Sequence, residues 1–164
     1  MPSVKNSIED LLRKYLAEEN ILKNNINSKE FDFGFIISFP PGPKSQNLSV
    51  YKPKNRNGIF ITIRFQISQG KAVILNSLKD NKKNQFFNDL RKYLLTREVF
   101  FKINLQNLII EIHEQIFPDK ENYISKNSLF KLILKVFYCY LYSNLLLEEY
   151  LNEKKTGYKN GTFF

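Results

Sequence analysis

The first apolar residues of the chain recur at helical spacing; they are Ile8, Leu11, Leu12, Tyr15 and Leu16. Ser7 followed by Asp10 resembles a capping box, in which side-chain oxygens satisfy unpaired amides of a first helical turn. The pattern predicts an amphipathic helix that ends near Glu19, with Asn20 as its stop signal. The asparagine-rich stretch that follows, residues 23–29, is interpreted as a connection.

The apolar period then changes to two, which is typical of strands with one buried face. The first strand places five residues on one face: Phe31, Phe33, Phe35, Ile37 and Phe39. A short second strand contains Leu48 and Val50. The prolines and the glycine of residues 40–43 must turn the chain between these strands, because proline lacks the amide hydrogen of a strand ladder. Asn57 and Gly58 predict a tight hairpin to a third strand, because both residues tolerate left-handed backbone angles.

Helical patterns return after the third strand. Ser68 is predicted to cap one helix and Asp80 its continuation, with a break near Asn81. A second hairpin follows, with strands around Phe101 and Ile110 joined at residues 105–107. A last helix of about 27 residues then begins at Ser125 and is on the order of 40 Å long.

This element order predicts the fold class. We expect an α+β fold, in the order α-βββ-αα-ββ-α, with a five-stranded, mainly antiparallel sheet and helices packed on one face. With 164 residues, of which 43% are hydrophobic, the chain can bury one core. We therefore predict a single domain over residues 1–153 and a flexible tail over residues 154–164.

Charge and cysteine content indicate a cellular setting and a class of partner. The formal charge is +9, and the region from Phe33 to Lys79 holds seven Lys and Arg residues without one acidic residue. Clustered positive charge favours contact with polyanions, so nucleic acid is a possible partner. The lone Cys139 cannot form an intramolecular disulfide, which favours a reducing, cytoplasmic location.

Side chains that could carry catalysis are few. His113 is the only histidine, and alternation along its strand places Glu111 on its own face but Glu114 on the opposite one. We therefore predict a solvated histidine rather than a general base. Cys139 lies among aromatic residues of the last helix and is predicted to be a buried thiol. With no metal-binding or cofactor-binding signature, the sequence indicates a protein that is not an enzyme and needs no cofactor.

The last helix is apolar around most of its circumference. Its predicted apolar side comprises Leu129, Phe130, Leu132, Ile133, Val136, Phe137, Tyr140, Leu141, Leu145 and Leu151. Either the other helices cover this surface or part of it packs against another chain, and we favour association. Tyr138, Tyr142 and Leu146 are the predicted contacts. Lys135 interrupts the most apolar stretch, which is shorter than the roughly 20 residues of a membrane span, so no span is predicted.

The open face of the sheet is the second predicted contact surface. Tyr51, Phe60 and Arg64 point to that face, whereas Phe65 belongs to the buried one. These residues are candidates for protein binding. The alternative is nucleic-acid binding, in which aromatic and basic side chains of a sheet hold a single strand; its candidate residues are Lys44, Lys52, Lys54, Arg56 and Arg64.

Several phrases of the sequence also resemble a known group: "IEDLLRKYLAEENI", "FDFGFIISFP", "LSVYKPKNRNGIFITIRFQIS" and "IIEIHEQIFPDKENYISKNSLFKLILKVF". Over residues 8 to about 151 the chain looks like an uncharacterised archaeal family of domains of unknown function, similar in topology to type III secretion chaperones. The resemblance implies a homodimer that holds a protein partner, and it defines no catalytic residues. This chain departs from such chaperones in charge, because they are generally acidic and it is basic.

Overall fold

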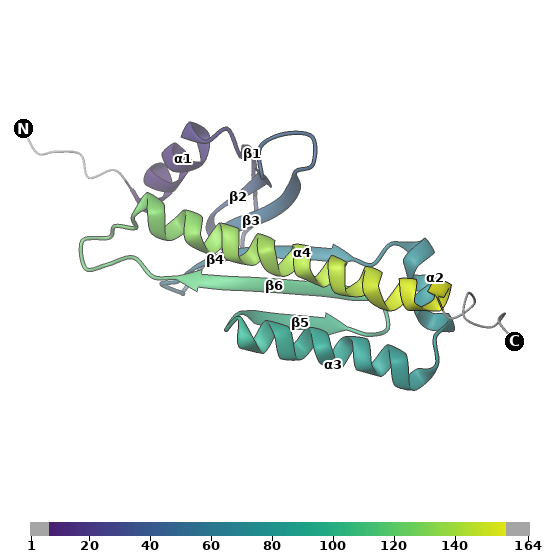
Figure 1. Ribbon diagram of the computed structural model, residues 1–164. Coiled ribbons are helices and arrows are strands. Elements are labelled where there is room, and N and C mark those ends of the chain that lie inside the picture. Colours follow the sequence, from purple (N-terminus) through teal and green to yellow (C-terminus); the bar gives the residue numbers. More distant parts are fainter. Residues whose placement is uncertain (1–6, 157–164) are drawn as a thin grey trace, which may run out of the picture. The chain divides into compact units, whose positions relative to one another are not determined.

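The computed structural model describes the backbone of residues 7–156 and the side chains of residues 7–152. In chain order its elements are α1 (Ile8–Glu18), β1 (Leu22–Asn25), β2 (Phe31–Phe39), β3 (Gln46–Pro53), β4 (Ile59–Gln66), α2 (Gln69–Ser77), α3 (Asp80–Thr96), β5 (Phe100–Asn104), β6 (Ile109–Ile116) and α4 (Lys126–Thr156). Figure 1 shows these helices and strands. The predicted α+β class is confirmed.

The sheet has six strands in the order β1-β2-β3-β4-β6-β5, so the predicted number of five is wrong. The missed strand is β1, which we interpreted as part of a connection. It pairs antiparallel with β2, with Leu22 opposite Ile37, and its other three residues are exposed. An edge strand such as this is held by backbone hydrogen bonds and needs no apolar alternation, which is why the sequence pattern did not predict it.

The chain divides into two compact units, and β4, β6 and α4 contribute residues to both. Described residues 7–63 and 113–137 form the first unit. There α1 lies beside β1 and β2, and the predicted cap is confirmed because the amide of Asp10 donates to Ser7 Oγ at 3.1 Å. Lys126 at the start of α4 pairs with Glu19 at 2.6 Å. The single domain over residues 1–153 remains a prediction.

The second unit contains described residues 64–112 and 138–156. α3 lies beside β5 in it (Figure 1). Its fully buried side chains include Leu75 of α2 and Phe86, Leu90 and Leu94 of α3. The break between α2 and α3 falls at residues 78–79, two residues before the predicted position near Asn81.

Two local expectations need correction. The left-handed residue between β3 and β4 is Asn55, with φ of 61°, and not the predicted pair of Asn57 and Gly58. A Cβ at Gly58 would lie 2.2 Å from Nε2 of Gln115, so any other residue there would displace that side chain. α4 continues to Thr156 and so includes the first residues of the predicted tail; the rest of that tail, residues 157–164, lies outside the described residues.

Candidate interaction surfaces

α4 buries one side against the rest of the protein. Its start is capped as predicted, because the amide of Ser128 donates to Ser125 Oγ at 3.0 Å. Leu129, Ile133, Val136 and Cys139 on this side are fully buried, which confirms the prediction of a buried Cys139 thiol.

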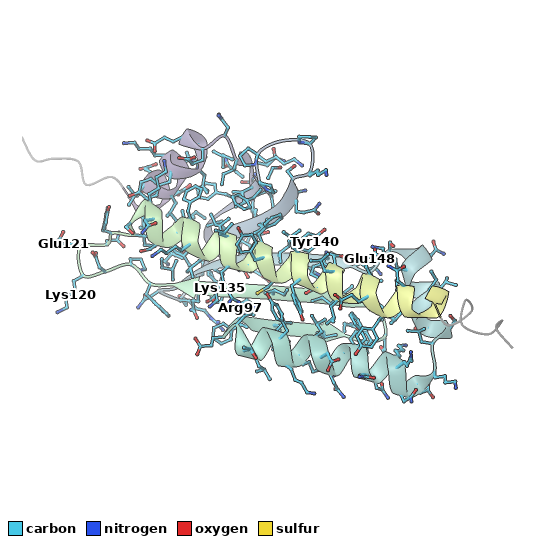
Figure 2. The ribbon with its side chains drawn as sticks, in the orientation of Figure 1. Arg97, Lys120, Glu121, Lys135, Tyr140 and Glu148 are labelled. Carbon is cyan, nitrogen blue, oxygen red and sulfur yellow. The ribbon has the colours of Figure 1, made fainter. Side chains whose placement is uncertain are left out.

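Lys135 reaches from α4 toward β6, as Figure 2 shows. Its Nζ lies 2.5 Å from Glu114 Oε1. That oxygen accepts no hydrogen bond of good geometry, so we describe the contact as an ion pair. Glu114 thus faces inward, as the alternation along its strand predicts.

The opposite side of α4 leaves large apolar side chains in contact with water. Leu134 is 37% exposed, Tyr138 50%, Leu141 40% and Leu145 63%. We call these four residues the α4 seam. They recur alternately four and three residues apart, which is the spacing of a helix face that packs against another helix. The last helix thus exposes an apolar strip, and its packing against another chain stays a prediction.

The predicted contact residues on α4 have different outcomes. Tyr138 and Tyr142 are exposed, but Leu146 is buried with 7% exposure and is not at the surface, where a contact residue would have to be. Leu141 and Leu145, which we placed on the apolar side of the helix, are exposed instead. The spacing alone does not identify the exposed face, because the buried residues Leu129, Ile133 and Val136 also recur four and three residues apart.

Tyr142 lies beside the seam and is held in place by α3. Its ring stacks on that of Tyr93, with centroids 3.5 Å apart and planes 12° from parallel. Burial raises the pKa of Tyr93, and the neighbouring Cys139 and Tyr142 raise it further. Farther along α4, Glu148 pairs with Lys71 of α2; Figure 2 labels Glu148 near α2.

A row of aromatic rings crosses the open face of the sheet in the first unit. The ring centroids of Phe31 and Tyr51 are 4.5 Å apart, those of Tyr51 and Phe60 5.6 Å, and those of Phe60 and His113 5.7 Å. We call these four residues the ring row. The guanidinium of Arg56 lies 6.0 Å above the Phe60 ring, within reach of a cation–π contact.

Phe31 joins the ring row because β2 is irregular where it begins. The register with β3 shifts between Phe31 and Phe33, which breaks the alternation that would place both on the buried face. The prediction that Phe31 is on that face is therefore wrong. Gly34 opens the space beside the row, since a Cβ there would lie 3.0 Å from the Cβ of Ile26 and 3.2 Å from that of Tyr51.

The geometry of the ring row limits what it can bind. Tyr51 and Phe60 are directly opposite on β3 and β4, and their planes are only 14° apart. Their faces therefore cover each other, and Phe60 retains only 8% exposure. Nucleic-acid-binding sheets stack bases on open ring faces, and here the faces of Tyr51 and Phe60 are already occupied by neighbouring rings. The predicted contact residue Phe60 is thus on the expected face but buried, and Tyr51 is half-buried.

The basic residues named for nucleic-acid binding differ in their exposure and in their neighbours. Lys44, Lys54 and Arg56 are exposed, whereas Lys52 is half-buried and pairs with Asp32. Arg64 is exposed but belongs to the second unit. It lines a small hollow of about 110 Å³ with Lys102, Asn104, Ile109 and Glu111.

The structure also bears on the residues considered for catalysis. His113 is half-buried at the end of the ring row, so its side chain is solvated only in part, and its lack of a catalytic role stays a prediction. Among residues 7–152, no three His, Cys, Asp or Glu side chains come together in a way that could hold a metal ion.

α4 is long and apolar enough to cross a membrane between Lys126 and Asn152, by length and composition alone. The core helix of a soluble protein meets the same criteria. This helix holds the buried thiol of Cys139 on one side and an ion pair between Lys135 and Glu114 near its middle. The prediction that the chain has no membrane span stays a prediction.

Comparison with known proteins identifies the family. A model of a family described as "Uncharacterized conserved protein (DUF2299)" matches residues 8–147. The chain belongs to this family. The DUF2299 fold is also similar to the crystal structure of an uncharacterized protein from Methanothermobacter thermautotrophicus, with a TM-score of 0.78 and 20% sequence identity. That match covers 87% of this chain and 97% of the other, and at this identity it establishes a shared fold. No curated protein matches the sequence.

Proposed function

We propose that this protein is a non-enzymatic, chaperone-like interaction module that works as a homodimer and holds a segment of another protein. The observation that carries the proposal is the α4 seam. Single exposed apolar residues are normal on protein surfaces, but an aligned set on one helix face is typical of an interaction site. Burying a leucine fully gains about 1.5–3 kcal/mol, so a second helix over the seam would recover a substantial free energy.

The partner that best fits the seam is a second copy of this chain. The seam is a narrow stripe on a long, regular helix, and the same stripe on another copy has the same length and spacing. Two such faces pair by placing side chains of one helix between those of the other. Most homo-oligomers are symmetric dimers that use one self-complementary surface twice.

The segment-binding part of the proposal depends on the edge of the sheet. β5 is the last strand in the sheet order, and its residues Phe100, Lys102 and Asn104 are exposed. An extended segment can add to such an edge by backbone hydrogen bonds. Lys102 disfavours the approach of a basic strand and favours an acidic residue directly opposite. We therefore expect an extended, acidic segment of a partner protein.

A pair of matched variants tests the homodimer. Leu145 in the seam is 63% exposed, and Leu95 on α3, outside it, is 65% exposed. Sedimentation equilibrium across micromolar concentrations should show a dimer for the wild type. Leu145→Glu should weaken dimerisation by at least about tenfold, and Leu95→Glu should leave it unchanged. A wild type that stays monomeric at the highest concentration, or equal effects of both variants, would contradict the proposal.

Nucleic-acid binding receives less support from the geometry. The exposed side chains of Lys44, Lys54 and Arg56 can attract phosphates. The ring faces that would stack bases are covered, and Lys52 is already paired with Asp32. Any binding through this region would then depend on charge alone, without base stacking.

A further inference from the structure

The charges at the two ends of the α4 seam suggest how two copies pair. One further step of the same spacing at each end of the seam reaches Lys131 and Glu148. The extended face comprises Lys131, Leu134, Tyr138, Leu141, Leu145 and Glu148, spaced alternately three and four residues apart. α4 is one uninterrupted helix over these positions. The face therefore begins with a positive charge, continues with four apolar residues and ends with a negative charge.

We propose that two copies of this chain pair antiparallel along α4, so that Lys131 of each copy faces Glu148 of the partner subunit. This inference rests on the proposed function, since it requires a homodimer, and it adds the direction and register of the pairing.

The spacing limits the register to a few alternatives seven residues apart, and the end charges choose among them. In antiparallel helix pairs, the first residue of a three-residue step on one helix lies opposite the last residue of a three-residue step on the other helix. With the two-fold axis crossing α4 between positions 139 and 140, Tyr138 faces Leu141 of the partner subunit, and Leu134 faces Leu145 of the partner subunit. The same axis brings Lys131 to Glu148 of the partner subunit. Each of these three contacts then occurs twice in the dimer.

Parallel pairing lacks this complementarity. It would place the two Lys131 side chains together at one end and the two Glu148 side chains together at the other, and like charges across an interface are strongly unfavourable. Lys131 is exposed, so its ammonium can reach a neighbouring helix. Glu148 forms an ion pair with Lys71, and 44% of its side chain is exposed. Its carboxylate can therefore accept a second cation.

Exchanging the charges provides a direct test. Lys131→Glu creates two repulsive contacts in its own homodimer, and Glu148→Lys does the same with the opposite sign. Lys71→Glu is combined with Glu148→Lys, so that the local pair with α2 is kept in reversed form. Each protein alone should dimerise at least about tenfold more weakly than the wild type. An equimolar mixture of the two should form a heterodimer with the affinity of the wild type, measured by sedimentation equilibrium with one protein fluorescently labelled.

The possible outcomes separate this inference from the proposed function. A wild-type dimer that Leu145→Glu disrupts, combined with no recovery of affinity on mixing the charge variants, would overturn the antiparallel register and leave the homodimer intact. A monomeric wild type would overturn both. Thermal unfolding monitored by circular dichroism identifies any variant that fails to fold. If either charge variant is unfolded, a mixture of Lys131→Gln with the wild type gives the second test. The mixed dimer should form with an affinity between those of the two homodimers. An affinity unchanged from that of the wild type would contradict the register.

Discussion

Lys135 of α4 and Glu114 of β6 form an ion pair that is mostly hidden from water, with 26% of the lysine side chain and 10% of the glutamate side chain exposed. A charge buried without its partner is much less favourable than a buried pair, because the remaining ion has lost its hydration.

The first prediction concerns this pair. Lys135→Met should lower the free energy of unfolding by about 3–5 kcal/mol, because it leaves the Glu114 carboxylate buried alone. Adding Glu114→Leu should restore most of the loss, since an apolar pair of similar volume needs no hydration. Urea unfolding followed by circular dichroism measures both. Lys92→Met, at an exposed lysine of α3, is the control and should change stability by no more than about 0.5 kcal/mol.

The second prediction compares two glycines. Gly34→Ala places a Cβ 3.0 Å from that of Ile26 and 3.2 Å from that of Tyr51, so the ring row must shift, at a cost of about 1–3 kcal/mol. Gly70→Ala in α2 meets nothing within 4 Å and should stabilise the protein by about 0.5–1 kcal/mol through its helix propensity. Thermal unfolding of the two variants should therefore move in opposite directions. If both variants shift the unfolding temperature equally and in the same direction, the contacts around Gly34 do not determine the effect of its substitution on stability.

The third prediction is a dependence of stability on alkaline pH. Burial raises the pKa of Tyr15 to about 12, with a further contribution from Tyr123, and its hydroxyl donates to the carbonyl of Ile124 at 3.1 Å. The unfolded chain loses this proton near pH 10, whereas the folded protein keeps it. The stabilisation is therefore complete below pH 10 and is lost as the pH rises toward 12.

Comparison with Tyr15→Phe isolates this effect, because phenylalanine has no proton to release. The variant should be less stable by about 1 kcal/mol at pH 7, where it lacks the hydrogen bond to Ile124. The difference in the free energy of unfolding between the variant and the wild type should shrink between pH 10 and pH 12. A constant difference across that range, measured by urea unfolding, would show that Tyr15 does not carry the dependence.

The fourth prediction addresses nucleic acid. Because the ring faces are covered, single-stranded RNA or DNA should bind weakly, with affinity that depends on salt and not on the aromatic residues. Fluorescence anisotropy at several salt concentrations measures this. Arg56→Gln with Lys54→Gln should reduce any binding, and Tyr51→Leu should have no effect. Tight binding that Tyr51→Leu abolishes at unchanged stability would revive the stacking model.

The fifth prediction tests the edge of the sheet. A synthetic peptide of alternating threonine and glutamate should bind along β5, and Lys102→Glu should abolish that binding. A matched peptide with lysine in place of glutamate should show the reverse preference. Backbone amide exchange of residues 100–104 should slow only with the peptide that binds. Protection elsewhere, with none in β5, would assign the segment to a different surface.

The elements with strong periodicity were predictable from the sequence, and the surfaces were less so. The strands β2 and β4 and the two capped helices α1 and α4 follow from alternation, helical spacing and the serines at their starts. β1 was missed because Lys23, Asn24 and Asn25 have no apolar signature. Phe31 was misplaced because a shift in strand register has no trace in a pattern of single residues.

The candidate site was predictable only in part, for a related reason. Composition indicated that α4 is too apolar to be covered completely, but it did not indicate which side remains uncovered. Leu145 and Leu146 differ by one position and about 100° around the helix, and only the packing of α4 decides which of them is buried. The ring row likewise depends on strand pairing, because Tyr51 and Phe60 become neighbours only when β3 and β4 align.

The complete burial of Cys139 has a practical consequence. Because that thiol is shielded from reagents, a cysteine introduced at an exposed site becomes the only position that a maleimide probe can modify in the folded protein. A spin label at the exposed position 127 of α4, which is outside the proposed contact residues, would then report the distance between its two copies in a dimer. That distance is short for parallel helices and long for antiparallel ones.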